Sequence, residues 1–180
     1  MRDAPTRLTD ALSLSFCAAA QPLHHAAAAD CGALVAALVG AGADTERCSN
    51  SSGTPLHWAA GEGAAAAARA LLAGGADPNA LDADGMPPLL LAVVNGAAAI
   101  VEDLLASGAD AHLAALPGGA TVLHVAAEVG CARCVGALLT WRGGGGALAG
   151  ARDAEGATPR DVAVAAGADA ALLALFDAYG

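Results

Sequence analysis

A short motif that recurs at nearly constant spacing constrains this chain more than any other feature of its sequence. The motif starts at five places, and the start-to-start spacings are 33, 33, 34 and 37 residues. The five starts are Gln21, Thr54, Pro87, Thr121 and Thr158. Self-similarity at a period of about 20–50 residues is typical of proteins built from stacked supersecondary units. The sequence therefore predicts a repeat architecture.

Further columns of residues keep the same register across the five units. Pairs of small or apolar residues follow five and six positions after each start, as in Ala59-Ala60 and Ala126-Ala127. An aspartate or a glycine follows nine positions after each start, and a large apolar pair such as Leu71-Leu72 follows at seventeen and eighteen. Agreement in so many columns is not expected by chance.

The second unit shows what each column does. Leu56, Ala59 and Ala60 have the spacing of one helix face. Thr54 is suited to the position just before a helix, and Gly63 can adopt the left-handed conformation that ends one. Each unit is therefore predicted to be a short helix, a turn, a longer helix and an extended connection. One such unit cannot bury its own apolar face, so the units must stack.

The segment GTPLHWAAGEGAAAAARALLAGGADPNA closely resembles the ankyrin repeat, whose pattern includes Thr-Pro-Leu-His-x-Ala-Ala at a period of about 33 residues. The resemblance extends over about residues 21–177, with units starting near 21, 54, 87, 121 and 158. It implies an all-α ankyrin-repeat solenoid of about five helix–turn–helix units with short β-turn or hairpin connections. Residues 1–20 are expected to form an N-terminal cap or tail.

The last two units depart from the pattern. Val122 stands where proline is expected, and unit four lacks the Gly-Ala-Asp turn. Residues 143–146 are four consecutive glycines, interpreted as a flexible insertion between units four and five. Unit five has Arg160 and Asp161 in the leucine and histidine positions, as suits a unit whose outer face meets water. The junction between these units is the expected site of earliest proteolysis.

Composition narrows the classes of function. The chain has 18 acidic residues against 8 basic ones, so the sequence argues against binding to nucleic acid. It contains no apolar run of the roughly 18–20 residues that a membrane span needs. Its five cysteines show no framework spacing, which favours a reducing compartment. We expect a cytoplasmic monomer, with the nucleus as an alternative and secretion disfavoured.

Three histidines share one column of the repeat. His24, His57 and His124 belong to different units, so they cannot converge on one metal ion. The resemblance implies that each forms a hydrogen bond with backbone of the neighbouring unit. No nucleophile or carboxylate pair has a catalytic arrangement, and we expect no enzyme activity, no metal and no cofactor.

A CxxC motif is formed by Cys131 and Cys134. Structural zinc needs four ligands, and a single pair supplies two of them. Cys134 stands in the column of Ala67 and Ile100, an inward position of the second helix. We therefore interpret it as a small buried apolar residue. Redox or metal chemistry is the less favoured alternative.

Asn79 introduces a possible modification. Together with Leu71 and Asp77, it matches by resemblance the spacing of ankyrin asparagines that undergo β-hydroxylation. The chemistry of turns favours the alternative that Asn79 has a structural role.

The resemblance implies a protein–protein interaction module, an adaptor or scaffold, that binds its partner through the concave face and loop tips. A regulatory subunit or inhibitor of an enzyme is the alternative. Recognition columns on the first helices hold Ala28, Ala29, Gly61, Glu62, Val94, Asn95, Glu128, Val129, Ala165 and Ala166. The partner-binding candidates are Glu62, Asn95, Glu128, Asp84, Glu155 and Trp58. No arginine occupies these columns, so a partner with a basic surface is expected.

Overall fold

A computed structural model describes residues 22–49, 53–113 and 116–179 of the chain. Within these residues the chain forms eleven α-helices and one short 3-10 helix, η1 (Pro117–Gly119). The predicted cap or tail at residues 1–20 lies outside the described residues. In the described part, no helix is both long enough and apolar enough to cross a bilayer.

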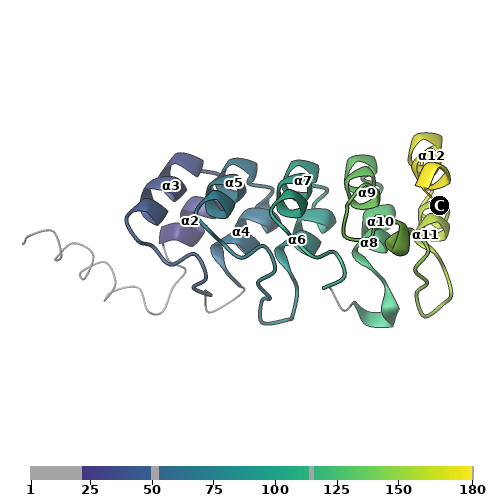
Figure 1. Cartoon of the computed structure of the whole chain (residues 1–180), viewed down its shortest axis with the longest axis horizontal. Helices are drawn as coiled ribbons and strands as arrows, with labels where there is room; N and C mark the ends of the chain where they lie inside the picture. The colour runs from purple at the N-terminus through teal and green to yellow at the C-terminus, as the bar shows by residue number, and fades with distance from the viewer. Residues whose placement is uncertain (1–21, 50–52, 114–115, 180) are drawn as a thin grey trace, which may run out of the picture.

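The helices form two rows that run along the molecule (Figure 1). The first helices of the units are α2 (Pro22–Ala28), α4 (Pro55–Glu62), α6 (Pro88–Val94), α8 (Val122–Val129) and α11 (Pro159–Ala165). The second helices are α3 (Gly32–Gly40), α5 (Ala65–Ala73), α7 (Ala98–Ala106), α9 (Ala132–Leu139) and α12 (Ala170–Tyr179). The long connections between units all extend from the side of the first-helix row (Figure 1). The predicted all-α stack of paired helices is confirmed.

Local sequence explains where the first helices begin and end. The backbone N–H of Thr54 donates to Nδ1 of His57 at 3.1 Å, which satisfies a donor at the start of α4. Thr121 and His124 form the equivalent bond of 3.0 Å at the start of α8. Gly63 ends α4 with a φ of 70°, the left-handed conformation in which glycine carries no steric penalty.

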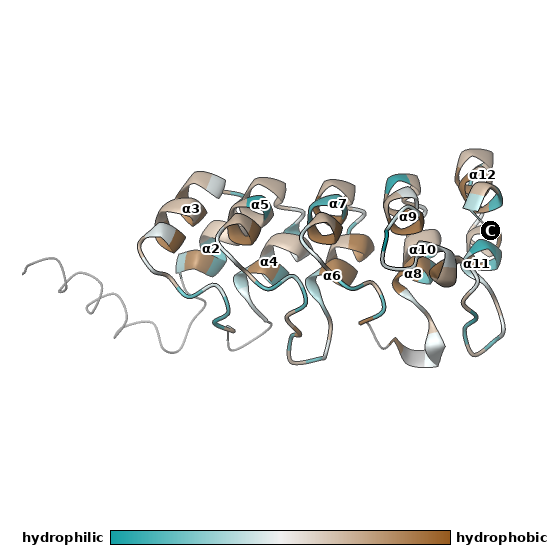
Figure 2. Ribbon diagram, in the orientation of Figure 1, coloured by the Kyte–Doolittle hydropathy of each residue, from teal (hydrophilic) through white to brown (hydrophobic). Residues whose placement is uncertain are grey.

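The core lies between the two rows and between neighbouring units. Its fully buried residues include the alanine pairs of the first helices and the leucines of the second, such as Leu71 and Leu104. Figure 2 shows hydrophobic residues along both rows and hydrophilic residues in the long connections. Burial of one leucine side chain contributes about 1.5–3 kcal/mol. The small alanines allow the helices to approach closely, so the stack is stabilised by many such contacts along its length.

Part of the four-glycine segment, interpreted from the sequence as a flexible insertion, is helical in the structure. Gly145 and Gly146 begin an additional helix, α10 (Gly145–Ala149), which packs against α9 and α12. Leu148 of this helix is only 1% exposed, and its burial offsets the high entropy cost of ordering the glycines. A Cβ at Gly145 would collide with the carbonyl oxygen of Leu139, so the close approach of α10 to α9 requires glycine there.

Candidate functional site

The three buried histidines tie each unit to the next one. His24, His57 and His124 are each at most 3% exposed. Their Nε2 atoms lie 3.3 Å from the carbonyl oxygen of Gly53, 3.0 Å from that of Met86 and 3.1 Å from that of Ala157, respectively. Each acceptor lies at least 29 residues further along the chain. The predicted hydrogen bonds between units are confirmed, and they give these residues a structural role.

The protonation of His57 follows from its contacts. Its Nδ1 accepts the N–H of Thr54, so the ring proton is on Nε2, which donates to the carbonyl of Met86. Burial lowers the pKa of His57, because the charged ring would lose its hydration. Burial is also the largest cause that lowers the pKa of His24. The fold therefore disfavours the charged form of both histidines.

Asn79 joins two successive connections with both ends of its amide. Its Nδ2 donates to the carbonyl oxygen of Gly108 at 3.0 Å. Its Oδ1 accepts the N–H of Asp110 at 2.8 Å. These bonds support the structural interpretation of this residue. Hydroxylation of Asn79 stays the less favoured alternative.

Three of the partner-binding candidates lie at the ends of successive first helices. Glu62 ends α4, Asn95 follows α6, and Glu128 is in the last turn of α8; all three are exposed. Helix α6 packs against both α4 and α8, so the three ends follow one another along the stack. The amide of Asn95 donates to the carbonyl oxygen of Leu91 at 3.0 Å, within its own helix. The carboxylates of the two glutamates are therefore more available to a partner than the amide of Asn95.

Exposed valines lie among these polar residues. Val94 and Val129 each occupy one of the two recognition columns of the first helices, and they are 52% and 43% exposed, respectively. They belong to the neighbouring helices α6 and α8, which pack side by side. The ends of the first helices thus combine carboxylates with apolar side chains that a partner can bury.

The two loop-tip candidates lie in connections of similar construction. Asp84 and Glu155 are both exposed. The carboxylate of Asp82 accepts the backbone N–H groups of Asp84 and Met86 at 2.9 and 2.8 Å. Asp153 accepts the N–H four residues further on in the same way, at 2.8 Å. Hydrogen bonds within each connection therefore hold both tips in place, on the side of the first-helix row (Figure 1).

The ion pairs of the described residues leave out the four acidic candidates. Within the described residues, Glu62, Asp84, Glu128 and Glu155 take part in no ion pair. The pairs that form are Arg69–Asp103, Arg133–Glu102 and Arg160–Asp177, each at 2.9 Å. Two of them join neighbouring second helices, so arginine charge is neutralised there. The carboxylates on the side of the first helices are not neutralised in this way.

Trp58 is the candidate with the clearest packing role. It is half-buried, and the centre of its ring lies 5.5 Å from that of His24 and 6.0 Å from that of His25, edge to face in both cases. This tryptophan therefore fills the space between units one and two, with only part of its surface left for a partner. A second ring contact, which the sequence did not indicate, places the ring centre of His112 5.5 Å from that of Trp141.

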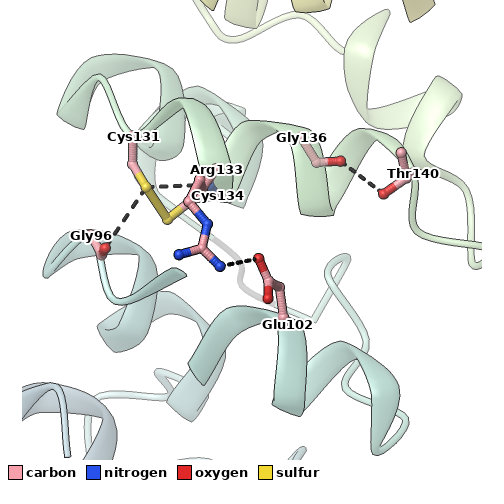
Figure 3. A network of polar contacts seen from close by, with 7 residues as sticks. All are labelled: Gly96, Glu102, Cys131, Arg133, Cys134, Gly136 and Thr140. Carbon is pink, nitrogen blue, oxygen red and sulfur yellow. Dashed lines mark hydrogen bonds and ion pairs between the residues drawn. A yellow bond between two sulfur atoms is a disulfide. The ribbon is translucent and has the colours of Figure 1, made fainter. Parts of the chain in front are cut away.

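The cysteine pair requires a correction. Cys134 is fully buried, as its column predicts, but it is joined to Cys131 in a disulfide rather than packed as a free thiol (Figure 3). Because the two cysteines are three positions apart, both sulfur atoms lie at the first turn of α9. The CxxC spacing was therefore the sequence feature that indicated a disulfide. Within the described residues, no group of three or more metal-ligating side chains exists.

Comparison with known proteins agrees with this geometry. The family model described as "Ankyrin repeats (3 copies)" matches residues 23–115 and 89–180. No curated protein matches the chain. Ankyrin repeats are in general non-catalytic modules for protein–protein interaction. Because the two matches together extend over most of the sequence, the chain belongs to the ankyrin repeat family.

Proposed function

We propose that this chain is an adaptor or scaffold that binds a basic surface of another protein through the ends of its first helices and its loop tips. The observation that carries the proposal is the charge distribution. Glu62, Asp84, Glu128 and Glu155 are exposed and form no ion pair within the described residues, whereas arginines of the second helices are paired. A regulatory subunit or inhibitor of an enzyme would use the same surface and differ in its partner.

Charges and apolar side chains contribute differently to such an interface. Two opposite charges 4 Å apart in water attract by about 1 kcal/mol, so exposed carboxylates mainly guide association and select the partner. Full burial of a valine side chain contributes about 1.5–3 kcal/mol. Val94 and Val129 would therefore supply affinity, while Glu62 and Glu128 at the ends of the same row of helices would repel acidic partners.

The test uses a charge reversal on the recognition columns. The partner is first isolated by affinity purification, and its binding to the wild-type chain is measured at low and high salt. We expect Glu62→Arg combined with Glu128→Arg to weaken binding at least tenfold at low salt. The difference should shrink as salt rises, because screening removes long-range attraction. The melting midpoint should hardly change, since both glutamates are exposed.

A matched control reverses charge on the other row. Arg69→Glu combined with Arg133→Glu breaks two exposed ion pairs of the second helices, and it should leave partner binding unchanged. The proposal fails if this pair abolishes binding, or if the double glutamate variant binds as the wild type does at low salt. Loss of activity of a bound enzyme in proportion to occupancy would identify the chain as an inhibitor.

A further inference from the structure

The start of helix α9 differs from the equivalent starts in units two and three. Helices α5 and α7 are preceded by Ala64 and Ala97, and neither alanine caps its helix. In unit four Cys131 occupies this position, and its sulfur accepts the N–H of Cys134 at 3.2 Å. A helix N-terminus favours negative charge, and hydrogen bonding to sulfur favours the thiolate. A thiolate released at Cys131 would therefore lie beside a backbone N–H at the start of a helix.

Cys131 and Cys134 are joined by a disulfide, and their Cα atoms are 5.2 Å apart. This separation lies within the range of about 4.4–6.8 Å that disulfides require, so the bond can form without moving the backbone. Disulfides stabilise the fold more when they close longer loops. A bridge between residues three positions apart closes a short loop and therefore adds little to the stability of the fold. A purely structural role explains such a bridge poorly.

The two cysteines differ in their exposure to solvent. Cys134 is fully buried, whereas Cys131 is half-buried. Cys131 lines a surface hollow of about 400 Å³ that runs across the turns of units two, three and four. The walls of this hollow also include Gly63, Gly96 and Ala97, whose side chains are small or absent. An external thiol therefore meets Cys131 first.

We propose that Cys131 and Cys134 form a reversible thiol–disulfide exchange site whose co-reactants are low-molecular-weight thiols and disulfides. An external thiolate attacks Sγ of Cys131, the Cys131–Cys134 bond breaks, and Cys134 leaves as a thiolate that takes up a proton. A second external thiolate attacks the external sulfur of the mixed disulfide and releases Cys131. The balance is one protein disulfide and two thiols converted to one protein dithiol and one external disulfide, a transfer of two electrons.

The two redox states differ in a contact between units three and four. Sγ of Cys131 lies 3.8 Å from the carbonyl oxygen of Gly96, in the turn after α6 (Figure 3). In the disulfide this sulfur has no hydrogen, so it cannot donate to that oxygen. The reduced thiol can donate, and reduction would replace a bond within α9 by a weak hydrogen bond to the preceding unit. The exchange site thus lies at a junction of the stack.

The experiment uses the full chain with Cys17, Cys31 and Cys48 replaced by serine. The protein is equilibrated with reduced and oxidised glutathione at a series of ratios, and is then quenched with acid and alkylated. Peptide mass spectrometry measures the fraction in the disulfide form. We expect this fraction to pass from nearly complete to nearly absent within the series. A bond that persists at the most reducing ratio, or never forms at the most oxidising one, overturns the proposal.

Single variants separate the roles of the two cysteines. Alanine is the residue of units two and three at the position of Cys131, and of unit two at that of Cys134, so both alanine variants are expected to fold. Cys134→Ala leaves Cys131 without its partner and should accumulate a mixed disulfide with glutathione. Cys131→Ala should form it at least tenfold more slowly, because Cys134 is buried. Equal rates in two variants with wild-type circular dichroism would also refute the proposal.

Discussion

Units two and five occupy the same columns of the repeat but are stabilised differently. Helix α4 buries five residues and α11 buries two. The residues are Pro55, Leu56, His57, Ala59 and Ala60 in α4, and Pro159 and Ala163 in α11. Unit two packs against a neighbour on each side, whereas unit five packs only against unit four and α10 within the described residues. The same helix–turn–helix pattern is therefore compatible with very different amounts of burial.

The two units also use the same capping position for different purposes. His57 caps its own helix through Nδ1 and reaches the next unit through Nε2, 3.0 Å from the carbonyl oxygen of Met86. Asp161 holds that position in unit five and accepts the N–H of Thr158 at 2.9 Å. An aspartate is too short to cap its own helix and also reach the backbone of another unit. The neighbouring residue Arg160 forms an ion pair with Asp177, which also lies within unit five. A bond between units is thus replaced by bonds within one unit.

The largest effect on stability is expected from substitution of leucines that occupy one column of the repeat. Leu71 of unit two is fully buried, whereas Leu175 of unit five is half-buried. Leu71→Ala should lower the free energy of unfolding by about 3 kcal/mol, since large-to-small core substitutions cost about 2–5 kcal/mol. Leu175→Ala should cost about 1 kcal/mol or less, because its site is partly hydrated. Denaturant unfolding followed by circular dichroism measures both, and equal losses would contradict the comparison.

An intermediate effect is expected from pH. Burial lowers the pKa of His57 below its usual 6.5, so below that pH the unfolded chain binds more protons than the folded one. Stability is therefore full above about pH 6.5 and falls as the pH drops below it. Hydrogen bonds from Thr158 lower the pKa of Asp161 below its usual 3.8, so that contribution is present above pH 3.8 and is lost only in stronger acid.

The measurement is the melting midpoint between pH 8 and pH 5. We expect the wild type to lose stability over this interval and His57→Asn to lose less, with the remainder due to His24. Asp161→Asn is the matched control, and its midpoint should depend on pH as that of the wild type does. If His57→Asn keeps the full pH dependence, His57 is not the residue responsible.

The smallest expected effect concerns the junction between units four and five. We predict that a protease of broad specificity first cuts residues 22–179 between Trp141 and Arg152, in or beside α10. A Cβ at Gly146 meets no atom within 4 Å, so Gly146→Ala should stabilise α10 by about 0.5–1 kcal/mol and slow this cut. The rate is followed by mass spectrometry of the fragments.

Gly145→Ala is the control for that substitution. Its Cβ would collide with the carbonyl oxygen of Leu139, so this variant should be cut faster than the wild type. A first cut between units two and three would show that the stack opens elsewhere. In that case the smaller burial of unit five would not determine where the chain opens.

Much of the fold was predictable because the repeat columns encode local structure. Thr54 before a proline and Gly63 eight residues after that proline specify where a helix begins and ends, whatever surrounds them. The period identified the buried histidine column, and its resemblance to the family implied the bonds between units. The positions of the recognition columns likewise follow from the register of the repeat.

Other features depend on atoms that only the folded chain brings together. Four glycines have no preferred conformation, and α10 forms because Leu148 finds a buried site against its neighbours. The pairing of Arg133 with Glu102, 31 residues away, depends on how α9 stacks on α7. The disulfide needed both the CxxC spacing and the helix that places its sulfur atoms together. The sequence by itself thus determined the helices and their periodic stacking, because these follow from local patterns. Tertiary structure decided the departures from the repeat, because they depend on contacts between units.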